Sequence, residues 1–113
     1  MPEVLLQREG AVARLLIDHA QRRNAFTRAM WRAVPALVAQ ALAQPGLRAL
    51  VVQGAEPGCF AAGADISEFA ATYATPEESL RANQEIQQAI DALSACPLPT
   101  VALIDGPCVG GGV

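Results

Sequence analysis

The strongest constraint on the fold of this chain is the alternation of apolar, β-rich segments with stretches of helical periodicity. Two β-rich segments, residues 4–9 and 12–18, flank a Gly-Ala pair, which is typical of a β-hairpin. Two further strands are predicted over residues 47–53 and 100–105, and the first of these is apolar enough to be covered on both faces. Because the later strands alternate with helices, the pattern predicts an α/β fold, and 113 residues suffice for one modest core.

Two segments carry the apolar spacing and the end signals of amphipathic helices. The first covers residues 27–44, with Thr27 as its N-cap and Pro35 inside it, where the missing N–H is expected to bend the helix. The second covers residues 75–95, with a proline at its first position and Glu78 placed for a capping box. Its buried face is expected to contain Leu80, Ile86, Ala89, Ile90 and Leu93.

Composition argues against several classes of function. Eight arginines stand against eleven acids, and the net charge of −3 gives no footprint for nucleic acid. One histidine and three widely spaced cysteines are too few ligands for a zinc site. No apolar stretch approaches the roughly 20 residues of a membrane helix. The odd number of cysteines, with no signal peptide before them, indicates a soluble protein with reduced thiols in the cytoplasm.

Two glycine-bearing loops each follow a strand and lead into a helical turn or its expected start. The first loop, residues 60–66 (FAAGADI), has small side chains that let a ligand approach the backbone, and Asp65 is placed to cap a short turn over residues 67–70. The second loop, residues 105–112 (DGPCVGGG), ends in three glycines. Backbone N–H groups at such places hold negative charge, so both loops can point at one oxyanion. A plain turn between a strand and a helix remains an alternative for each loop.

The second loop does not fit the common phosphate-binding motifs. A P-loop needs a lysine, and the chain contains none. A dinucleotide fingerprint would need a further glycine beyond Val113, and it normally follows the first strand of its unit. What remains is a bare backbone at a strand end, which a ligand can approach closely.

Together with residues 23–26 (RNAF), the two loops resemble the enoyl-CoA hydratase/isomerase family, the crotonases, in order and spacing. The resemblance implies a crotonase-like (ClpP/crotonase) spiral of ββα units, of which residues 1–113 form the N-terminal part of one domain, cut after the second loop. It implies acyl-CoA or enoyl-CoA thioesters as substrates, with coenzyme A part of the substrate rather than a cofactor. It also implies a homo-oligomer, a trimer or hexamer in the intact family, and it requires no metal, nucleic acid or membrane.

The same resemblance assigns roles to individual residues. The backbone amides of Ala64 and Gly111 would form an oxyanion hole that holds the thioester oxygen as an enolate develops. Contacts to CoA or substrate would come from Arg22, Arg23, Ala25, Ala62, Asp65, Ile66, Pro107 and Val109. For the two arginine side chains, simple solvation is the favoured alternative. The two glutamates that carry acid–base chemistry in the family's hydratases would lie beyond Val113.

The expected activity is therefore that of an enoyl-CoA hydratase-type lyase in fatty acid metabolism. The same hole would serve isomerisation, dehalogenation, decarboxylation or thioester hydrolysis, and the motifs do not choose among these reactions. Two alternatives stay open, an acyl-CoA-binding module without turnover and a fragment that pairs with subunits of the family. No carboxylate within the chain stands out as an acid–base pair, Glu68 is expected on the exposed side of its turn, and His19 is interpreted as structural or solvated.

Ending the chain at Val113 has two further expected consequences. The amide of Gly111 is well aimed only if a helical turn forms around it, so the hole is expected to be half-built. The apolar strand over residues 100–104 is expected to leave an exposed edge that promotes association.

Overall fold

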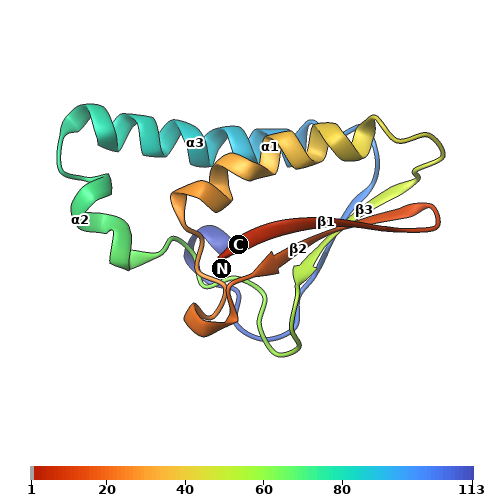
Figure 1. Cartoon of the computed structure of the whole chain (residues 1–113), viewed down its shortest axis with the longest axis horizontal. Coiled ribbons are helices and arrows are strands. Elements are labelled where there is room, and N and C mark those ends of the chain that lie inside the picture. The colour runs from red at the N-terminus through yellow and green to blue at the C-terminus, as the bar shows by residue number, and fades with distance from the viewer. Residues whose placement is uncertain (1) are drawn as a thin grey trace.

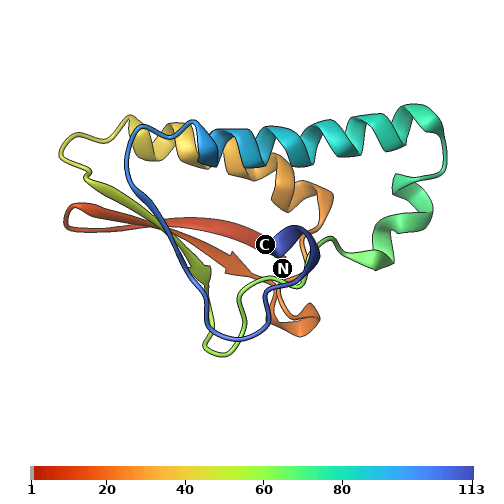
Figure 2. The ribbon, with the colours of Figure 1, turned by 180° about the vertical axis from the view of Figure 1, so that it is seen from behind.

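The computed structural model describes residues 2–113 as a four-stranded sheet with two long helices on one face (Figures 1 and 2). The strands lie in chain order across the sheet. They are β1 (Glu3–Glu9), β2 (Val12–Asp18), β3 (Ala49–Gly54) and β4 (Thr100–Leu103). The helices are α1 (Arg28–Leu42), α2 (Phe69–Thr72) and α3 (Pro76–Ser94), and short 3-10 turns cover Ala20–Arg22, Ile66–Glu68 and Gly110–Gly112.

The pairing of the strands brings three loops to one edge of the sheet. β1 and β2 form the predicted antiparallel hairpin, whereas β2–β3 and β3–β4 are parallel. Parallel strands end at the same edge, so the loops that follow β2, β3 and β4 meet there. These loops, residues 19–27, 55–65 and 104–109, contain the three motifs of the sequence.

The core lies between the sheet and α1. Its largest fully buried apolar side chains are Leu15 and Ile17 of β2, Met30 of α1 and Leu50 of β3. Full burial of such a side chain stabilises the fold by about 1.5–3 kcal/mol. The prediction that the third strand is covered on both faces is wrong, because Leu50 is the only fully buried residue of β3 and helices cover one face only.

Both long helices begin where their capping residues predict. The Thr27 hydroxyl accepts a hydrogen bond from the Met30 amide at 3.2 Å, and the Thr75 hydroxyl accepts one from the Glu78 amide at 3.1 Å. The predicted capping box of α3 is wrong, because the Glu78 carboxylate does not turn back to the cap. It pairs with Arg28 at 3.0 Å and with Arg81 at 2.8 Å, since two guanidinium groups compete with one backbone N–H.

The buried face of α3 is narrower than its apolar pattern predicts. Ala89 is fully buried, and Ile86 and Leu93 pack against the core. Leu80 and Ile90 are exposed, at 61% and 42%, which corrects the prediction for these two residues. Leu80 lies near the first turn of α3, which extends beyond the N-terminal end of α1, so α1 does not cover it (Figure 1).

The last strand, β4, forms one of the two edges of the sheet within residues 2–113, and β1 forms the other. β4 ends two residues earlier than predicted, and all four of its residues are exposed. The expected exposed apolar edge is therefore present, with Val101 at 50% and Leu103 at 52% exposed. None of the helices in this part of the chain combines the length and apolar character needed to cross a membrane.

Candidate functional site

The first glycine-bearing loop is fastened on one side to the residues that precede α1. The Phe26 amide donates to the Gly63 carbonyl at 2.7 Å, and the Asp65 amide donates to the Phe26 carbonyl at 2.7 Å. These two bonds make a parallel bridge between Phe26 and Ala64. In such a bridge the residue between the two bonded neighbours turns its own N–H and C=O away, so the Ala64 amide faces away from Phe26.

On its other side the same loop is fastened to the second glycine-bearing loop. The Ala61 amide donates to the Pro107 carbonyl, and the Val109 amide donates to the Ala61 carbonyl, both at 3.2 Å. This is a second parallel bridge, between Ala61 and Cys108. The first loop thus lies between two neighbours that hold it by backbone bonds.

The approach of the two loops at Gly63 favours glycine. Gly63 has a φ of +92°, and a Cβ added to it would lie 3.3 Å from the Gly111 nitrogen and 3.3 Å from the Val109 carbonyl oxygen. The triple glycine forms a 3-10 turn in which the Gly112 amide donates to the Val109 carbonyl at 2.9 Å. A helical turn therefore forms around Gly111, whereas the expectation of a half-built hole stays a prediction.

Several backbone amides at this junction have no partner, and those of Ala64 and Gly111 are among them. Within residues 2–113, neither the Ala64 N–H nor the Gly111 N–H donates to a backbone or side-chain acceptor. Gly111 is exposed and Ala64 is half-exposed, so both amides lie near solvent rather than in the core. Free N–H groups on two loops in contact are suited to bind an oxygen that carries negative charge.

Asp65 caps the short turn after the first loop, as predicted. Its carboxylate accepts from the Ser67 amide at 2.9 Å and from the Ser67 hydroxyl at 2.7 Å, and only 7% of the residue is exposed. The Ser67 hydroxyl bond is the largest cause of an Asp65 pKa below its usual range, and the nearby His19 and Arg22 lower the pKa further. The carboxylate is thus held in its charged form as part of the loop structure.

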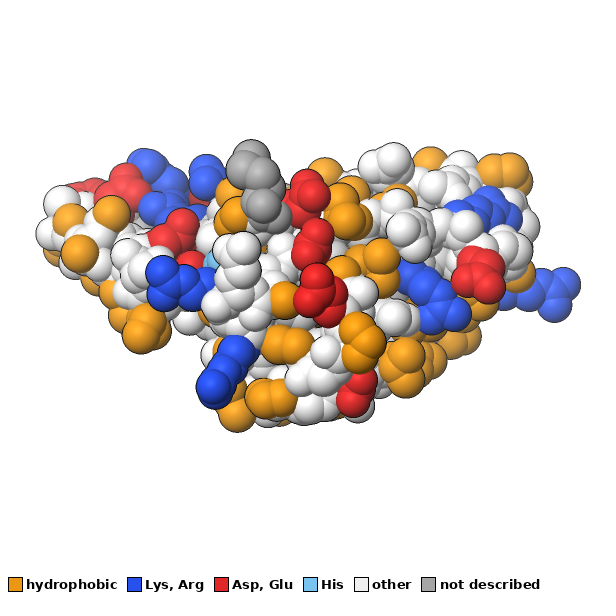
Figure 3. All heavy atoms as spheres, turned by 60° about the horizontal axis from the view of Figure 1, so that its bottom comes forward, with side chains coloured by type: hydrophobic (Ala, Val, Ile, Leu, Met, Phe, Trp, Pro, Cys, Tyr) orange, Lys and Arg blue, Asp and Glu red, His pale blue; other side chains and the backbone are white. Residues whose placement is uncertain are grey.

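The other residues predicted to contact CoA differ widely in exposure. Arg22 and Arg23 lie in or beside an exposed turn and form no ion pair within residues 2–113. Ala25 is buried, and its carbonyl lies 2.7 Å from His19 Nδ1, which gives that histidine a structural contact. Ala62 is half-buried, whereas Ile66, Pro107 and Val109 are exposed. On the face seen in Figure 3, charged side chains of both signs are mixed rather than gathered in a basic patch.

Asn24 has a structural role at the site that the sequence analysis did not assign. It is 1% exposed with a φ of +59°, a conformation that Asn tolerates better than most residues. Its Oδ1 accepts from the His19 amide at 2.9 Å, and its Nδ2 donates to the carbonyls of Phe60 at 3.0 Å and Cys59 at 3.3 Å. Asn24 therefore ties the loop after β2 to the start of the first glycine-bearing loop.

The carboxylates near the first loop have partners. Glu68 is half-buried rather than exposed as predicted, because it accepts from the Arg28 amide at 2.8 Å. The Arg28 guanidinium bonds Glu85 and Glu78, each at 3.0 Å, and these bonds raise the Arg28 pKa and lower the Glu78 pKa. Among residues 2–113 there is no group of three or more side chains able to hold a metal ion.

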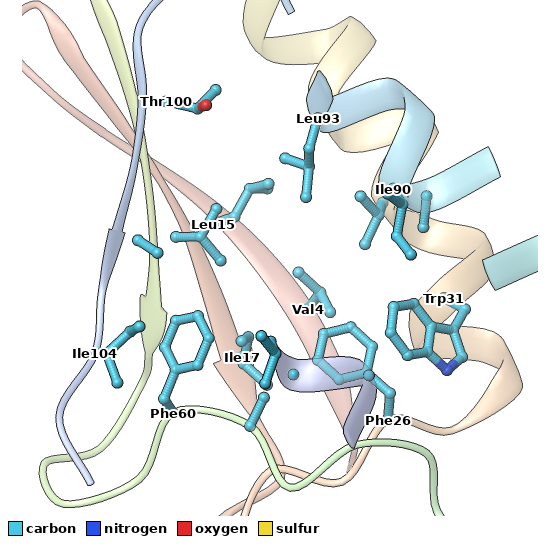
Figure 4. A pocket seen from close by; sticks show the side chains of 18 of the residues that line it. Val4, Leu15, Ile17, Phe26, Trp31, Phe60, Ile90, Leu93, Thr100 and Ile104 are labelled. Carbon is cyan, nitrogen blue, oxygen red and sulfur yellow. The ribbon is translucent and has the colours of Figure 1, made fainter. Parts of the chain in front are cut away.

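An apolar cavity of about 370 Å³ lies between the sheet and the helices, next to the triple glycine. Figure 4 shows its lining, with Leu15 and Ile17 on the sheet side and Ile90 and Leu93 on the helix side. The cavity reaches Gly111, so this residue has the apolar interior on one side and is still partly exposed.

Comparison with known proteins decides the family. A family model described as enoyl-CoA hydratase/isomerase matches residues 7–113. The chain belongs to the enoyl-CoA hydratase/isomerase family. Among its members, the probable enoyl-CoA hydratase EchA14 of Mycobacterium tuberculosis is 36% identical over 110 residues, which are 97% of this chain and 42% of that protein. The fatty acid oxidation complex subunit alpha of Vibrio vulnificus is 37% identical over 93 residues, which are 82% of this chain and 13% of that protein.

Solved structures of the family share the fold. A putative enoyl-CoA hydratase/isomerase family protein from Hyphomonas neptunium superposes with a TM-score of 0.94 at 42% identity, over 99% of this chain and 42% of that one. An enoyl-CoA hydratase/carnithine racemase from Magnetospirillum magneticum gives 0.92 at 37% identity, over the same shares of the two chains. The chain therefore has the N-terminal part of the crotonase fold, and it spans about two-fifths of the length of these relatives.

Proposed function

We propose that this chain supplies the oxyanion hole of an enoyl-CoA hydratase/isomerase-type enzyme that acts on acyl-CoA thioesters. One observation carries the proposal: Ala64 and Gly111 lie on two loops in contact, and each has an amide N–H without an acceptor. In enzymes with such a hole, loss of one preorganised donor costs about 2.7–4 kcal/mol of transition-state stabilisation.

The chemistry follows from where charge develops on a thioester. When a nucleophile adds to the double bond of an enoyl thioester, or when a proton leaves the carbon next to the carbonyl, negative charge moves to the carbonyl oxygen. Two N–H groups fixed by the bridges at Phe26 and Ala61 meet that charge without first giving up other partners. We assign Ala62, Asp65, Ile66, Pro107 and Val109 to the binding of CoA or substrate, together with Arg22, Arg23 and Ala25 of the loop after β2.

A second candidate function is acyl-CoA binding without turnover. Hydration requires a base for the water and an acid for the carbon, and such groups typically contribute roughly 10²–10⁴-fold. The observation that favours this candidate is that Asp65 is bonded to Ser67 and Glu68 to Arg28, which leaves neither carboxylate free for proton transfer.

We also propose a homo-oligomer that resides in the cytoplasm. The exposed apolar residues of β4 favour association of subunits, and the three cysteines are free thiols, which a reducing compartment preserves. Sedimentation over a range of concentrations tests the assembly, and a stable monomer throughout would contradict it.

The test of the function is a calorimetric titration of the chain with a 3-oxoacyl-CoA thioester, followed by a hydration assay with an enoyl-CoA on the same sample. The decisive variant is Ala64→Pro, which removes one N–H that the bridge to Phe26 does not use. Ala64→Ser is the matched control because it keeps the N–H. Circular dichroism checks that both variants are folded.

Three outcomes are distinguishable. Binding with turnover, both lost in Ala64→Pro and kept in Ala64→Ser, supports the enzyme. Binding without turnover, with the same dependence on Ala64, supports the second candidate. A folded chain that does not bind the thioester contradicts both.

A further inference from the structure

Trp31, the only tryptophan of the chain, lies against the triple glycine. It belongs to α1 and is 6% exposed. A Cβ added to Gly111 would lie 3.3 Å from Cζ2 and 3.4 Å from Cη2 of the indole ring. The far edge of the six-membered ring therefore borders the space that a side chain at residue 111 would occupy.

Trp31 also connects Gly111 with the other loop through an aromatic pair. The rings of Phe26 and Trp31 lie side by side, with centroids 4.3 Å apart and planes tilted by 33° (Figure 4). The backbone of Phe26 holds the residues on both sides of Ala64 by two bonds of 2.7 Å. One short segment, residues 26–31, thus supports Ala64 through its backbone and Gly111 through a side chain.

Hydrogen bonding does not explain why a tryptophan occupies position 31, because its indole N–H forms no hydrogen bond within residues 2–113. Its Nε1 is buried and has no partner within residues 2–113. A buried donor without an acceptor is unfavourable, and a leucine or phenylalanine would avoid that penalty. What the larger side chain provides is the reach of its six-membered ring to Gly111.

We propose that Trp31 is a positioning residue that holds the Gly111 amide in the direction required by a thioester oxygen. The proposal rests on the proposed function, and it assigns Trp31 no contact with the substrate. Without the ring, the turn formed by Gly110–Gly112 keeps its backbone bonds but gains room to rotate toward the cavity.

The test compares two ligands, an acyl-CoA thioester and the thioether analogue that lacks the carbonyl oxygen. The ratio of the thioester affinity to the thioether affinity reports the contact with the carbonyl oxygen alone. A net hydrogen bond to that oxygen makes the wild-type chain bind the thioester roughly tenfold more tightly. We expect Trp31→Leu to reduce this ratio by at least about threefold while thioether binding is unchanged. Val38→Ala is the matched control, since it removes buried volume from α1 at a residue that does not line the cavity.

Replacement of Trp31 by benzothienylalanine, which keeps the ring shape without the N–H, should restore the wild-type ratio. A ligand-free measurement accompanies the titrations, because the ring is close enough to shift the resonances of Gly111. In spectra of the chain labelled with ¹⁵N-glycine, Trp31→Leu should move the Gly111 signal and leave Gly10 and Gly58, which have open space around them.

The proposal and the function on which it rests fail in different ways. If the wild-type chain binds neither ligand, the proposed function is wrong. The role of Trp31 is then wrong too, even if Trp31→Leu moves the Gly111 signal. If the wild-type chain prefers the thioester and folded Trp31→Leu keeps the full preference, the function stands and the role of Trp31 is wrong. A Gly111 signal that Trp31→Leu does not move also overturns the role.

Discussion

Replacing Asn24 with alanine should destabilise the fold more than any exposed substitution, although Asn24 is a loop residue. The amide side chain is 1% exposed and links the loop after β2 to the first glycine-bearing loop. Asn24→Ala leaves the His19 amide and the Phe60 carbonyl without these partners. It also puts alanine at a φ of +59°.

The magnitude follows from these contacts. Two bonds of 2.9 and 3.0 Å contribute about 0.5–1.5 kcal/mol each in net terms. The left-handed conformation costs an ordinary residue about 1–2 kcal/mol. The sum is a loss of about 2–5 kcal/mol, a large part of the roughly 5–15 kcal/mol that stabilises a domain.

Urea denaturation followed by circular dichroism measures this loss. Asn24→Gly, which accepts a positive φ, isolates the hydrogen-bond part and should lose less than Asn24→Ala. Asn83→Ala is the matched control, because Asn83 is exposed on α3 and its replacement should change stability by less than about 0.5 kcal/mol. If Asn24→Ala unfolds at the same urea concentration as the control, the bonds assigned to Asn24 do not hold the loop.

Three further predictions concern the loops and α1. Gly63→Ala should abolish the preference for a thioester over its thioether, because a Cβ at a φ of +92° and 3.3 Å from the Gly111 nitrogen pushes the loops apart; unchanged selectivity in titrations would refute this contact. The bond from Ser67 lowers the pKa of Asp65 in the folded state. The charged carboxylate therefore stabilises the fold at pH values above the unfolded-state pKa of about 3.9, and this stabilisation is lost as the pH falls through the folded-state pKa. The stability difference between wild type and Asp65→Asn should therefore disappear in acid denaturation series, and a difference that stays constant down to pH 2 would contradict it. Arg28→Met should cost about 1 kcal/mol by urea denaturation, less in high salt, since its ion pairs to α3 are partly exposed; equal loss at all salt concentrations would exclude an ionic origin.

Elements with local signals were predictable from the sequence. The hairpin follows from two β-rich segments on either side of a tight turn, and both helix starts follow from a threonine whose hydroxyl accepts from the amide three residues later. The Asp65 cap is of the same local kind. The capping partners lie within three residues of each other and the two strands of the hairpin follow one another directly, so a local sequence pattern contains both partners.

Features that depend on distant partners were not predictable. The Glu78 carboxylate leaves its capping position for Arg28, which lies 50 residues earlier in the chain. Leu80 is exposed because α3 extends past α1. The apolar pattern of α3 does not show where α1 begins or ends, so it could not predict this exposure. The two carbonyls to which Asn24 donates lie 35 and 36 residues away, so the motif shows the asparagine but not these acceptors.

The candidate site combines both kinds of information. Resemblance to the family located Ala64 and Gly111, and a 3-10 turn forms around Gly111, whereas the expectation of a half-built hole stays a prediction. That expectation considered only hydrogen bonds within a helix. The contact with Gly63 and the ring of Trp31 come from other parts of the chain.

The central claim is that the amides of Ala64 and Gly111 bind one thioester oxygen. Nuclear magnetic resonance of the chain labelled with ¹⁵N-alanine and ¹⁵N-glycine tests it most directly, with signals followed during titration with a 3-oxoacyl-CoA thioester. We expect the amide protons of Ala64 and Gly111 to shift downfield together with one binding constant, as protons do when they enter hydrogen bonds, and the thioether analogue to leave both unshifted. Saturable binding of the thioester that moves neither amide proton would contradict the account.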